Sequence, residues 1–547
     1  MRGRTPEAMP ALLPLLLAFL TLGVSEEGWR VEQEALYALP LLLALPHLLG
    51  WRARKLLISG RFRRARLLLR LLTHAPVLGH AAAMLLLGYG PALERWMGRS
   101  LDMTWWPDLW VVVAIAPWLI LELLAIDARA RLQYRDPDYI RRTRRWQLRS
   151  LSGLLAPLLL FLLISAAVGT SEGARVRIET VGLFASLYST ALILLFVALL
   201  PWVLTKAWDT RPLPAGPLRE IFERVAQHAD FRAREIYAWN TEGSMANAAI
   251  VGIGSRLRVV LFSDALLSQL NGRELAAVYA HEIAHAKRGH VLLFGLWAVG
   301  AFLAGDLAAR HWFAEDPLLQ TVCVLGALLL WFLFFGWLSR RCELEADLFA
   351  LRLFGSHEPI ASALERVGGR LRDVAGWRHF SIAQRVQFLE RAAQDPELGR
   401  RLERGLSVWF ALGLVLALSM GGLHGWHELQ RLPGEQLEAD LKLGLYGQAV
   451  ERVDAGTPVD ARQAALVEIA RTLPADRLAA AEFEELALAA WVRGAERERV
   501  EGLLVLGAYR GDWMLVELAA ALSQPEKSLP ERFEARWGPL RRLSRDQ

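Results

Sequence analysis

The decapeptide His-Glu-Ile-Ala-His-Ala-Lys-Arg-Gly-His occupies residues 281–290 of a chain of 547 residues. His281 and His285 are four residues apart, so both point from the same face of a helix. Two neutral imidazoles at this spacing can bind one Zn²⁺, and Glu282 then projects beside the ion, where a general base is needed. Because histidines at this spacing also occur by chance, a third ligand has to decide the chemistry.

The third ligand is expected from the stretch Ser-Arg-Arg-Cys-Glu-Leu-Glu-Ala-Asp, residues 339–347. Glu343 can supply a carboxylate oxygen, which completes a set of two histidines and one glutamate and leaves a fourth position open. Asp347, one helical turn further on, can accept the free N–H of a ligand imidazole. Glu345 is an alternative ligand, but on a helix it faces away from Asp347, so Glu343 is preferred. Without the histidines, these acids would be read as a solvated charged face.

The composition is typical of a multi-pass membrane protein. Hydrophobic residues make up 54% of the chain, and there are 21 tryptophans, which is unusual for a soluble enzyme. The length exceeds what one compact core normally holds, so more than one domain is expected. The two cysteines, Cys323 and Cys342, exclude a framework of disulfides.

Apolar runs are spread over most of the chain. Four are long enough to cross a bilayer, and they cover residues 105–126, 151–169, 181–204 and 318–338. Shorter runs lie near residues 10–24, 36–50, 76–90, 291–304 and 406–422. The first resembles a signal peptide, but no small-residue cleavage site follows it, so an uncleaved anchor is favoured.

Basic loops give the expected orientation in the membrane. Residues 52–70 and 129–149 are rich in arginine, and both lie between apolar runs, where cytoplasmic loops belong. This placement explains the basic clusters without nucleic acid, which is not an expected partner. Counting crossings places 206–290 and 339–405 in the cytoplasm and the tail after residue 426 on the opposite side. The expected location is a prokaryotic inner membrane.

The predicted fold class is mainly α, with a bundle of membrane helices and a catalytic part that contains a small β-hairpin or sheet. The predicted domains are the N-terminal transmembrane helices (1–205), a zinc metallopeptidase domain (206–405) that includes a transmembrane hairpin (291–338), a last transmembrane helix (406–426) and a soluble helical tail (427–547). The tail resembles a short array of helical hairpins, which commonly bind protein partners. Its predicted breaks are at Gly434, Gly456, Pro474, Gly494 and Pro525.

Two local predictions concern the surroundings of the histidines. The helix that carries them is expected to begin near Arg273 and to run on into the apolar segment 291–304. Ahead of it, Ala248–Val251 and Arg256–Phe262 flank a glycine-rich turn, which predicts a β-hairpin. An edge strand there could pair with an extended peptide substrate, or the hairpin could only cover the core.

The motifs together resemble the integral-membrane gluzincin family of zinc metallopeptidases, which contains the CAAX prenyl proteases and the HtpX-like heat-shock proteases. The resemblance covers roughly residues 215–392 and rests on Asn247-Ala248-Ala249, Glu274, His281-Glu282-Ile283-Ala284-His285, His290, Ser339-Arg340, Glu343, Ala346-Asp347, His379 and Arg385. The membrane segments before it match the family only in kind, and the tail does not match.

The resemblance implies a role for each matching residue. His281, His285 and Glu343 would bind one Zn²⁺ per chain, Glu282 would be the general base and later the proton donor, and Asp347 would hold a ligand histidine. His379 and Arg385 would steady the oxyanion. Asn247 would begin a substrate-binding edge strand, although Ala249 stands where the family usually has an aromatic residue. His290 matches a position common among the CAAX proteases, and a histidine at the membrane interface explains it better than a ligand does.

The expected function is a membrane-embedded zinc metalloendopeptidase that cleaves membrane-associated or misfolded proteins at the cytoplasmic face. One alternative is a sensor-transducer peptidase resembling the BlaR and MecR receptors, which a ligand pocket in the tail would favour. Another is a non-catalytic membrane scaffold whose zinc site has decayed, which a metal assay would reveal.

Overall fold

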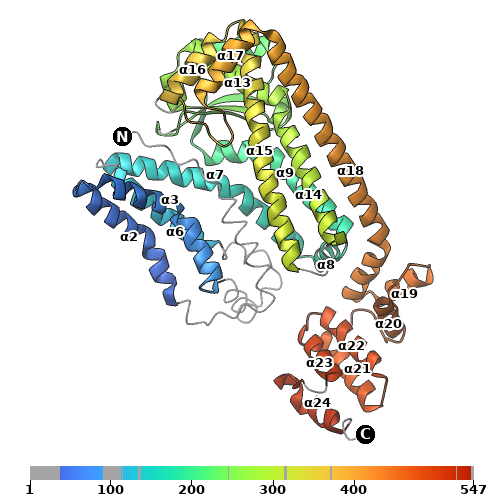
Figure 1. Ribbon diagram of the computed structural model, residues 1–547. Helices are drawn as coiled ribbons and strands as arrows, with labels where there is room; N and C mark the ends of the chain where they lie inside the picture. Colours follow the sequence, from blue (N-terminus) through green and yellow to red (C-terminus); the bar gives the residue numbers. More distant parts are fainter. Residues whose placement is uncertain are drawn as a thin grey trace. The chain divides into compact units, whose positions relative to one another are not determined.

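The computed structural model describes residues 37–89, 113, 115–133, 137–243, 245–312, 317–369, 372–524 and 527–543. This part of the chain is mainly helical, with one small sheet and several long apolar helices, so the predicted fold class is confirmed (Figure 1). The chain divides into two compact units. The first unit comprises residues 1–166 and 193–421, and the second comprises 167–192 and 422–547. The predicted domain limits stay a prediction.

The first unit begins with a group of closely packed helices: α2 (Leu39–Ile58), α3 (Phe62–Leu85) and α6 (Ala116–Gln133). Small residues allow this packing, because Gly50 approaches the side chain of Ala128 and a Cβ on Gly50 would lie 3.1 Å from it. Leu72 and Ala125 are fully buried between the helices. The basic residues 52–70 surround the turn between α2 and α3. Two further long helices follow, α7 (Pro137–Gly169) and α9 (Gly182–Ala207).

A four-stranded sheet follows α9 and has the order β1-β2-β4-β3. Its strands are β1 (Thr210–Pro212), β2 (Glu235–Trp239), β3 (Ala248–Val251) and β4 (Val259–Ser263). Strands β3 and β4 are antiparallel neighbours, so the predicted hairpin is confirmed, and the short helix α11 (Gly254–Leu257) lies in its connection. Strand β2 pairs with β4 in parallel, which leaves β3 at one edge of the sheet. Helices α10 (Pro217–His228) and α12 (Asp264–Gln269) complete this layer.

The histidine motif lies on α13 (Gly272–Lys287), which begins at the predicted position. Asn271 caps it: its side chain accepts from the backbone N–H of Glu274, and Glu274 accepts from the backbone N–H of Asn271. The expected continuation into residues 291–304 is wrong. The chain breaks at Gly289, whose φ of 67° is incompatible with a right-handed helix, and α14 (His290–Trp312) starts anew.

Buried aromatic rings fix α13 against the sheet. Tyr279 is 1% exposed, and its ring lies edge-on to Phe222 and Phe262, with centroids 5.2 Å and 5.8 Å away. Phe222 and Phe262 stack on each other at 4.4 Å. Full burial of one such side chain is worth about 1.5–3 kcal/mol, so this face of α13 is firmly held. The histidines lie on another face of the helix.

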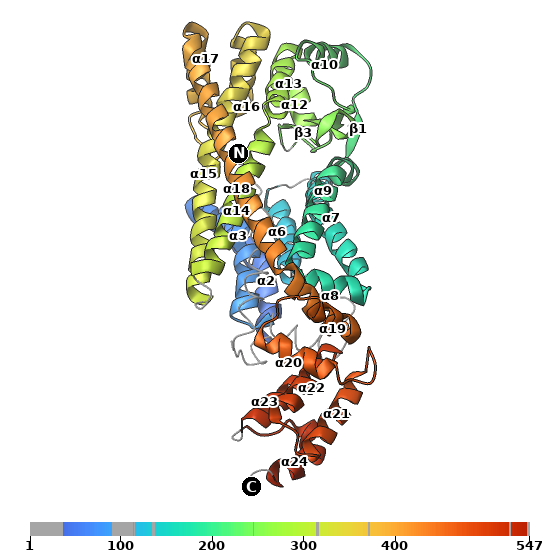
Figure 2. The same ribbon diagram turned by 90° about the vertical axis from the view of Figure 1, so that its right-hand side faces the viewer.

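Three helices lie near that second face of α13: two pack against it, and the third packs against those two. They are α15 (Pro317–Phe354), α16 (Glu358–Gly368) and α17 (Ile382–Gln394). Figure 1 shows α13, α16 and α17 gathered around one end of α15. Figure 2 shows α10, α12 and α13 beside the sheet at the same end. The sheet, α13, α16 and α17 therefore lie together at one end of α15.

Five helical stretches of the described residues are long and apolar enough to cross a membrane, and one of them joins α13 and most of α14 across the break at Gly289. The spans are Phe62–Met84, Ile140–Gly169, Gly182–Ala207, Gly272–Ala309 and Pro396–Lys442. The runs at 151–169, 181–204, 291–304 and 406–422 fall within these spans, and 318–338 falls within α15. The run at 10–24 and part of 105–126 lie outside the described residues. The prediction of a chain with several membrane-length helices is confirmed.

The second unit is entirely helical in its described residues. It contains α8 (Glu172–Thr180), the first part of α9, the end of α18 (Pro396–Lys442), α19 (Tyr446–Asp454), α20 (Ala461–Ala470), α21 (Ala480–Val492), α22 (Arg497–Tyr509), α23 (Met514–Ser523) and α24 (Glu531–Leu543). Phe483, Leu504 and Trp537 are fully buried in its core. The predicted break at Gly434 is wrong, because α18 continues through it and buries Leu437 and Leu441 in this core. The predicted breaks at Gly456, Pro474 and Gly494 fall between helices, and Pro525 lies outside the described residues.

Candidate metal centre

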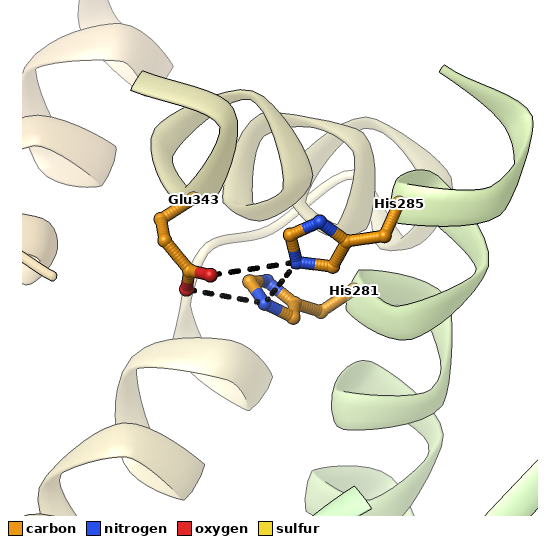
Figure 3. A group of neighbouring side chains, drawn as sticks. All are labelled: His281, His285 and Glu343. Atoms are coloured by element: carbon orange, nitrogen blue, oxygen red, sulfur yellow. Dashed lines mark hydrogen bonds and ion pairs between the residues drawn. The ribbon is translucent and has the colours of Figure 1, made fainter. Parts of the chain in front are cut away.

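Two neighbouring helices bring three ligand atoms together. Helix α13 supplies His281 and His285, and α15 supplies Glu343 (Figure 3). The two Nε2 atoms of the histidines are 3.2 Å apart. Nε2 of His281 lies 3.6 Å from Oε2 of Glu343, and Nε2 of His285 lies 3.6 Å from Oε1 of the same carboxylate. The structure therefore brings together the three residues that the sequence predicts as ligands.

The spacing of these atoms fits one zinc ion. Ligand nitrogens and oxygens lie about 2.0–2.2 Å from Zn²⁺, so two ligand atoms of a tetrahedral site are roughly 3.3–3.6 Å apart. The observed distances of 3.2 Å and 3.6 Å are close to this spacing. His281 and Glu343 are buried, and His285 is half-buried, so the group is accessible from one side. Two imidazoles and one carboxylate leave a fourth position for a reactant.

Asp347 holds His281 from the side opposite the ligand atom. Its Oδ1 lies 2.9 Å from Nδ1 of His281, as the sequence predicts. Arg385 on α17 donates to both oxygens of Asp347, at 2.8 Å and 2.7 Å. Burial alone would raise the pKa of Asp347, but the Arg385 guanidinium and the His281 imidazole together outweigh burial and hold that pKa below its ordinary value. Asp347 therefore stays a carboxylate and can accept the N–H of His281.

His379 and Arg385 both reach Glu343 but differ in exposure. Nδ1 of His379 lies 3.3 Å from Glu343 Oε2, and Nη1 of Arg385 lies 3.4 Å from the same atom. The side chain of His379 is 48% exposed, whereas that of Arg385 is 9% exposed and already engaged with Asp347. His379 is therefore better placed to touch a substrate, and Arg385 is better placed to fix the two carboxylates.

Glu282 and Asn247 occupy different surroundings. Glu282 is half-buried on α13, immediately after His281, and its carboxylate forms no hydrogen bond or ion pair within the described residues. Asn247 is exposed just before β3, and its backbone N–H donates to Ser263 Oγ at 2.8 Å. The backbone at Asn247 is thus fixed to β4, while its side chain faces solvent.

Two residues that carry the resemblance, His290 and Glu274, make contacts that the sequence did not predict. His290 is 2% exposed and lies between His285 and Glu345 rather than at an open interface. Glu274 accepts from Ser362 at 2.6 Å and lies 3.1 Å from Arg366, so it joins α13 to α16. The sequence signal for Glu274 is its position three residues after Asn271. The contact of His290 depends on the break at Gly289, which the sequence alone did not reveal.

The fold and the site together define a class of protein: a helical membrane protein with a buried His-His-Glu group beside a small sheet. Residues 212–404 match the model of peptidase family M48. The match covers this segment of the chain, and it confirms the resemblance to the integral-membrane gluzincins.

Related proteins carry names consistent with this family. The chain is 30% identical over 162 residues to a CAAX prenyl protease 1 homolog of Arabidopsis thaliana, a match that covers 26% of this chain and 38% of that protein. It is 27% identical over 167 residues to a protease HtpX homolog of Bordetella pertussis, covering 28% of this chain and 56% of that protein. The chain thus spans about half the length of the curated relatives it matches, or less. The crystal structure of S. mikatae Ste24p is 14% identical, with a TM-score of 0.37 over 69% of this chain and 98% of that one.

Proposed function

We propose that this chain is a membrane-embedded zinc metalloendopeptidase that hydrolyses peptide bonds of membrane-associated or misfolded proteins at the cytoplasmic face. The observation that carries the proposal is the approach of His281, His285 and Glu343. The two Nε2 atoms are 3.2 Å apart, and each lies 3.6 Å from a different oxygen of Glu343. The names of the related proteases and the M48 match support the same reaction.

The chemistry follows from the positions of the side chains. A bound Zn²⁺ would act as a Lewis acid that polarises water and the substrate carbonyl. The unpaired carboxylate of Glu282 takes a proton from the attacking water and later gives it to the leaving amine. The exposed His379 donates to the carbonyl oxygen as negative charge develops there. Arg385 acts one step away, because it holds Asp347 and Glu343 in place.

The edge of the sheet offers a place for the substrate. Strand β3 pairs with β4 on one side only, so its other side can accept an extended peptide through main-chain hydrogen bonds. Asn247 lies at the start of this edge. Main-chain pairing is tolerant of side-chain identity, which suits misfolded proteins as substrates. A prenylated substrate is not proposed, since no residue of this chain supports one.

The basic loops support one orientation of the protein in the membrane. The arginine-rich segments 52–70 and 129–149 support a cytoplasmic active site, with the C-terminal helices on the opposite side of a prokaryotic inner membrane. Those helices are proposed to bind a protein partner, which their arrangement as successive helical hairpins supports. One cavity of the second unit, lined by Arg177, Asp440 and Arg452 among others, has a volume of 130 Å³. It is below the ~300 Å³ of typical ligand pockets, so it gives the sensor alternative no support.

Substitution Glu282→Gln tests the proposed enzyme. The purified variant should retain one zinc per chain and lose proteolysis of an unfolded protein such as casein by about 100-fold or more, because the general base is absent. Metal analysis and a cleavage assay in detergent measure both quantities. Glu220→Gln, an exposed change on α10, is the matched control and should behave as the wild-type protein.

Two results would contradict the proposal. A wild-type protein without bound zinc would instead support a scaffold with a decayed site. Full cleavage by clean Glu282→Gln protein would remove Glu282 from its role. Once the inactive variant is in hand, mass spectrometry of the proteins that it retains in membranes identifies the substrates.

A further inference from the structure

A series of buried polar side chains in contact with one another leads away from the candidate metal centre. His290 opens α14, is 2% exposed, and places its Nδ1 2.8 Å from Nδ1 of His285. Its other nitrogen, Nε2, lies 2.7 Å from Oε2 of Glu345. Glu345 is 6% exposed, so the end of this series that lies farthest from the metal centre is shielded from water. Buried polar groups in such a line have few alternative partners.

We propose that His290 and Glu345 form a positioning relay that fixes the ring orientation and tautomer of the zinc ligand His285. The inference rests on the proposed zinc site and assigns two further residues to it. Neither residue is a ligand: His290 turns both nitrogens to other side chains, and Glu345 is occupied by His290. Both act on the metal only through His285.

The hydrogen-bond chain has one consistent direction. His285 faces His281 and Glu343 with Nε2, so that nitrogen must be free of a proton to bind zinc. The proton of neutral His285 then lies on Nδ1, which donates to Nδ1 of His290. His290 in turn carries its proton on Nε2, and this N–H donates to the carboxylate of Glu345. Every donor in the chain therefore meets an acceptor.

The same arrangement holds the other ligand histidine. Oδ1 of Asp347 lies 2.9 Å from Nδ1 of His281, the nitrogen that faces away from the other ligands. Glu345 receives the N–H of His285 through His290. Each of the two imidazoles is thus backed by a carboxylate from α15. Carboxylates that orient ligand histidines commonly raise metal affinity, and their loss costs about 10–100-fold.

The break at Gly289 is what brings His290 into position. On a continuous helix a residue five positions after His285 would point about 140° away from it. The left-handed backbone of Gly289, with φ of 67°, redirects the chain so that His290 turns back to His285. Arg288 lies beside Glu345, with Nε 3.9 Å from Oε1, and also donates to Glu403. Glu345 is therefore held in place from a second side.

Zinc affinity of the full-length protein in detergent tests the relay. His290→Phe keeps a ring of similar size but removes both hydrogen bonds, and Glu345→Leu removes the final acceptor. Competition with a series of chelators should show zinc binding weakened about 10–100-fold in each variant. The double variant should lose no more than the stronger single variant, because the residues act in one line. Glu345→Gln retains an acceptor oxygen and should restore most of the affinity.

Matched controls separate positioning from a general loss of stability. His228→Phe and Glu390→Leu replace exposed residues of the same types and should leave zinc affinity unchanged. The unfolding temperature of each variant, measured with excess chelator, reports the stability of the metal-free protein. If His290→Phe fails to fold, the comparison of Glu345→Leu with Glu345→Gln still gives the answer.

Three outcomes overturn the relay. If His290→Phe or Glu345→Leu binds zinc as tightly as the wild-type protein, His285 does not need the relay. Additive losses in the double variant show two separate effects. A wild-type protein that binds no zinc removes the proposed function together with the relay, whereas zinc-binding, active variants remove the relay alone.

Discussion

Arg385 is the residue on which the charges of the candidate site depend. It donates twice to Asp347, and its remaining Nη1 lies 3.4 Å from Glu343. Asp347 is fully buried and Glu343 is 8% exposed, so two carboxylates share one buried cation. The pKa of Glu343 lies well below its ordinary value, because hydrogen bonds and nearby positive charge outweigh the effect of burial.

Loss of Arg385 should therefore destabilise the first unit. Arg385→Met leaves two buried carboxylates without their cation, and breaking such a pair costs about 3–5 kcal/mol. The unfolding temperature of the purified protein in detergent should fall clearly, and zinc binding should weaken. Arg391→Met changes an exposed arginine on the same helix and is the control. An unchanged unfolding temperature for Arg385→Met would show that the cation is dispensable.

Residues whose partners follow from helical spacing could be predicted from the sequence. His281 and His285 share a face because they are four apart, and Asp347 follows Glu343 by one turn, which places both beside the same histidines. His290 and Glu345 could not be assigned in this way. Their contact needs a change of chain direction at Gly289, and a single glycine in an apolar context does not specify such a change.

At the scale of elements, the segment between α16 and α17 carries His379 and is anchored on α15. Trp377 stacks on Phe332 with ring centroids 3.9 Å apart. Its indole also fits against Gly336, where an added Cβ would lie 2.3 Å from Nε1. The backbone N–H of Gly376 donates to the carbonyl of His379 at 3.0 Å, which closes the turn. The position of His379 thus depends on a glycine of α15.

Gly336→Ala should displace this segment. The added methyl group cannot coexist with the indole of Trp377, so the segment shifts and His379 loses its place beside Glu343. Cleavage should slow while zinc binding is retained, because the three ligands are untouched. Peptidase assays and metal analysis on the same preparation check both. Gly326→Ala lies on the same helix with open space around it and serves as control. Equal activity of both variants would show that the anchor does not position His379.

At the scale of the whole molecule, the grouping of residues 167–192 with the C-terminal helices was not predicted. Within the second unit, Val176 and Val181 share a small core with Ala439 and Leu443. The backbone N–H of Gly182 donates to Glu435 at 2.9 Å, a contact between positions 253 residues apart. Hydrophobic periodicity and composition describe local structure. They do not indicate which distant segments of the chain contact each other. The apolar helices themselves were predictable, because length and hydropathy are local properties.

Each unit has its own hydrophobic core, and only the first contains the candidate metal centre. A ligand that binds the folded state stabilises it by about 2.7 kcal/mol at a hundred times its Kd. Removal of zinc should therefore loosen the helices that hold the site and leave the other core unchanged. Hydrogen exchange measured by mass spectrometry should show faster exchange in α13 and α17 after chelation, with α21 and α22 unaffected.

Restored zinc should reverse this effect in the wild-type protein but not in Glu343→Ala, which lacks the carboxylate ligand. Faster exchange in α13 and α17 of that variant, with or without zinc, would tie the change to the metal and not to the chelator. Equal acceleration in both units would contradict the localisation, since a metal bound by residues of α13 and α15 acts first on the helices packed against them. An unchanged exchange pattern would mean that the first unit holds these side chains in place without any ion, and zinc would then serve the reaction and not the fold.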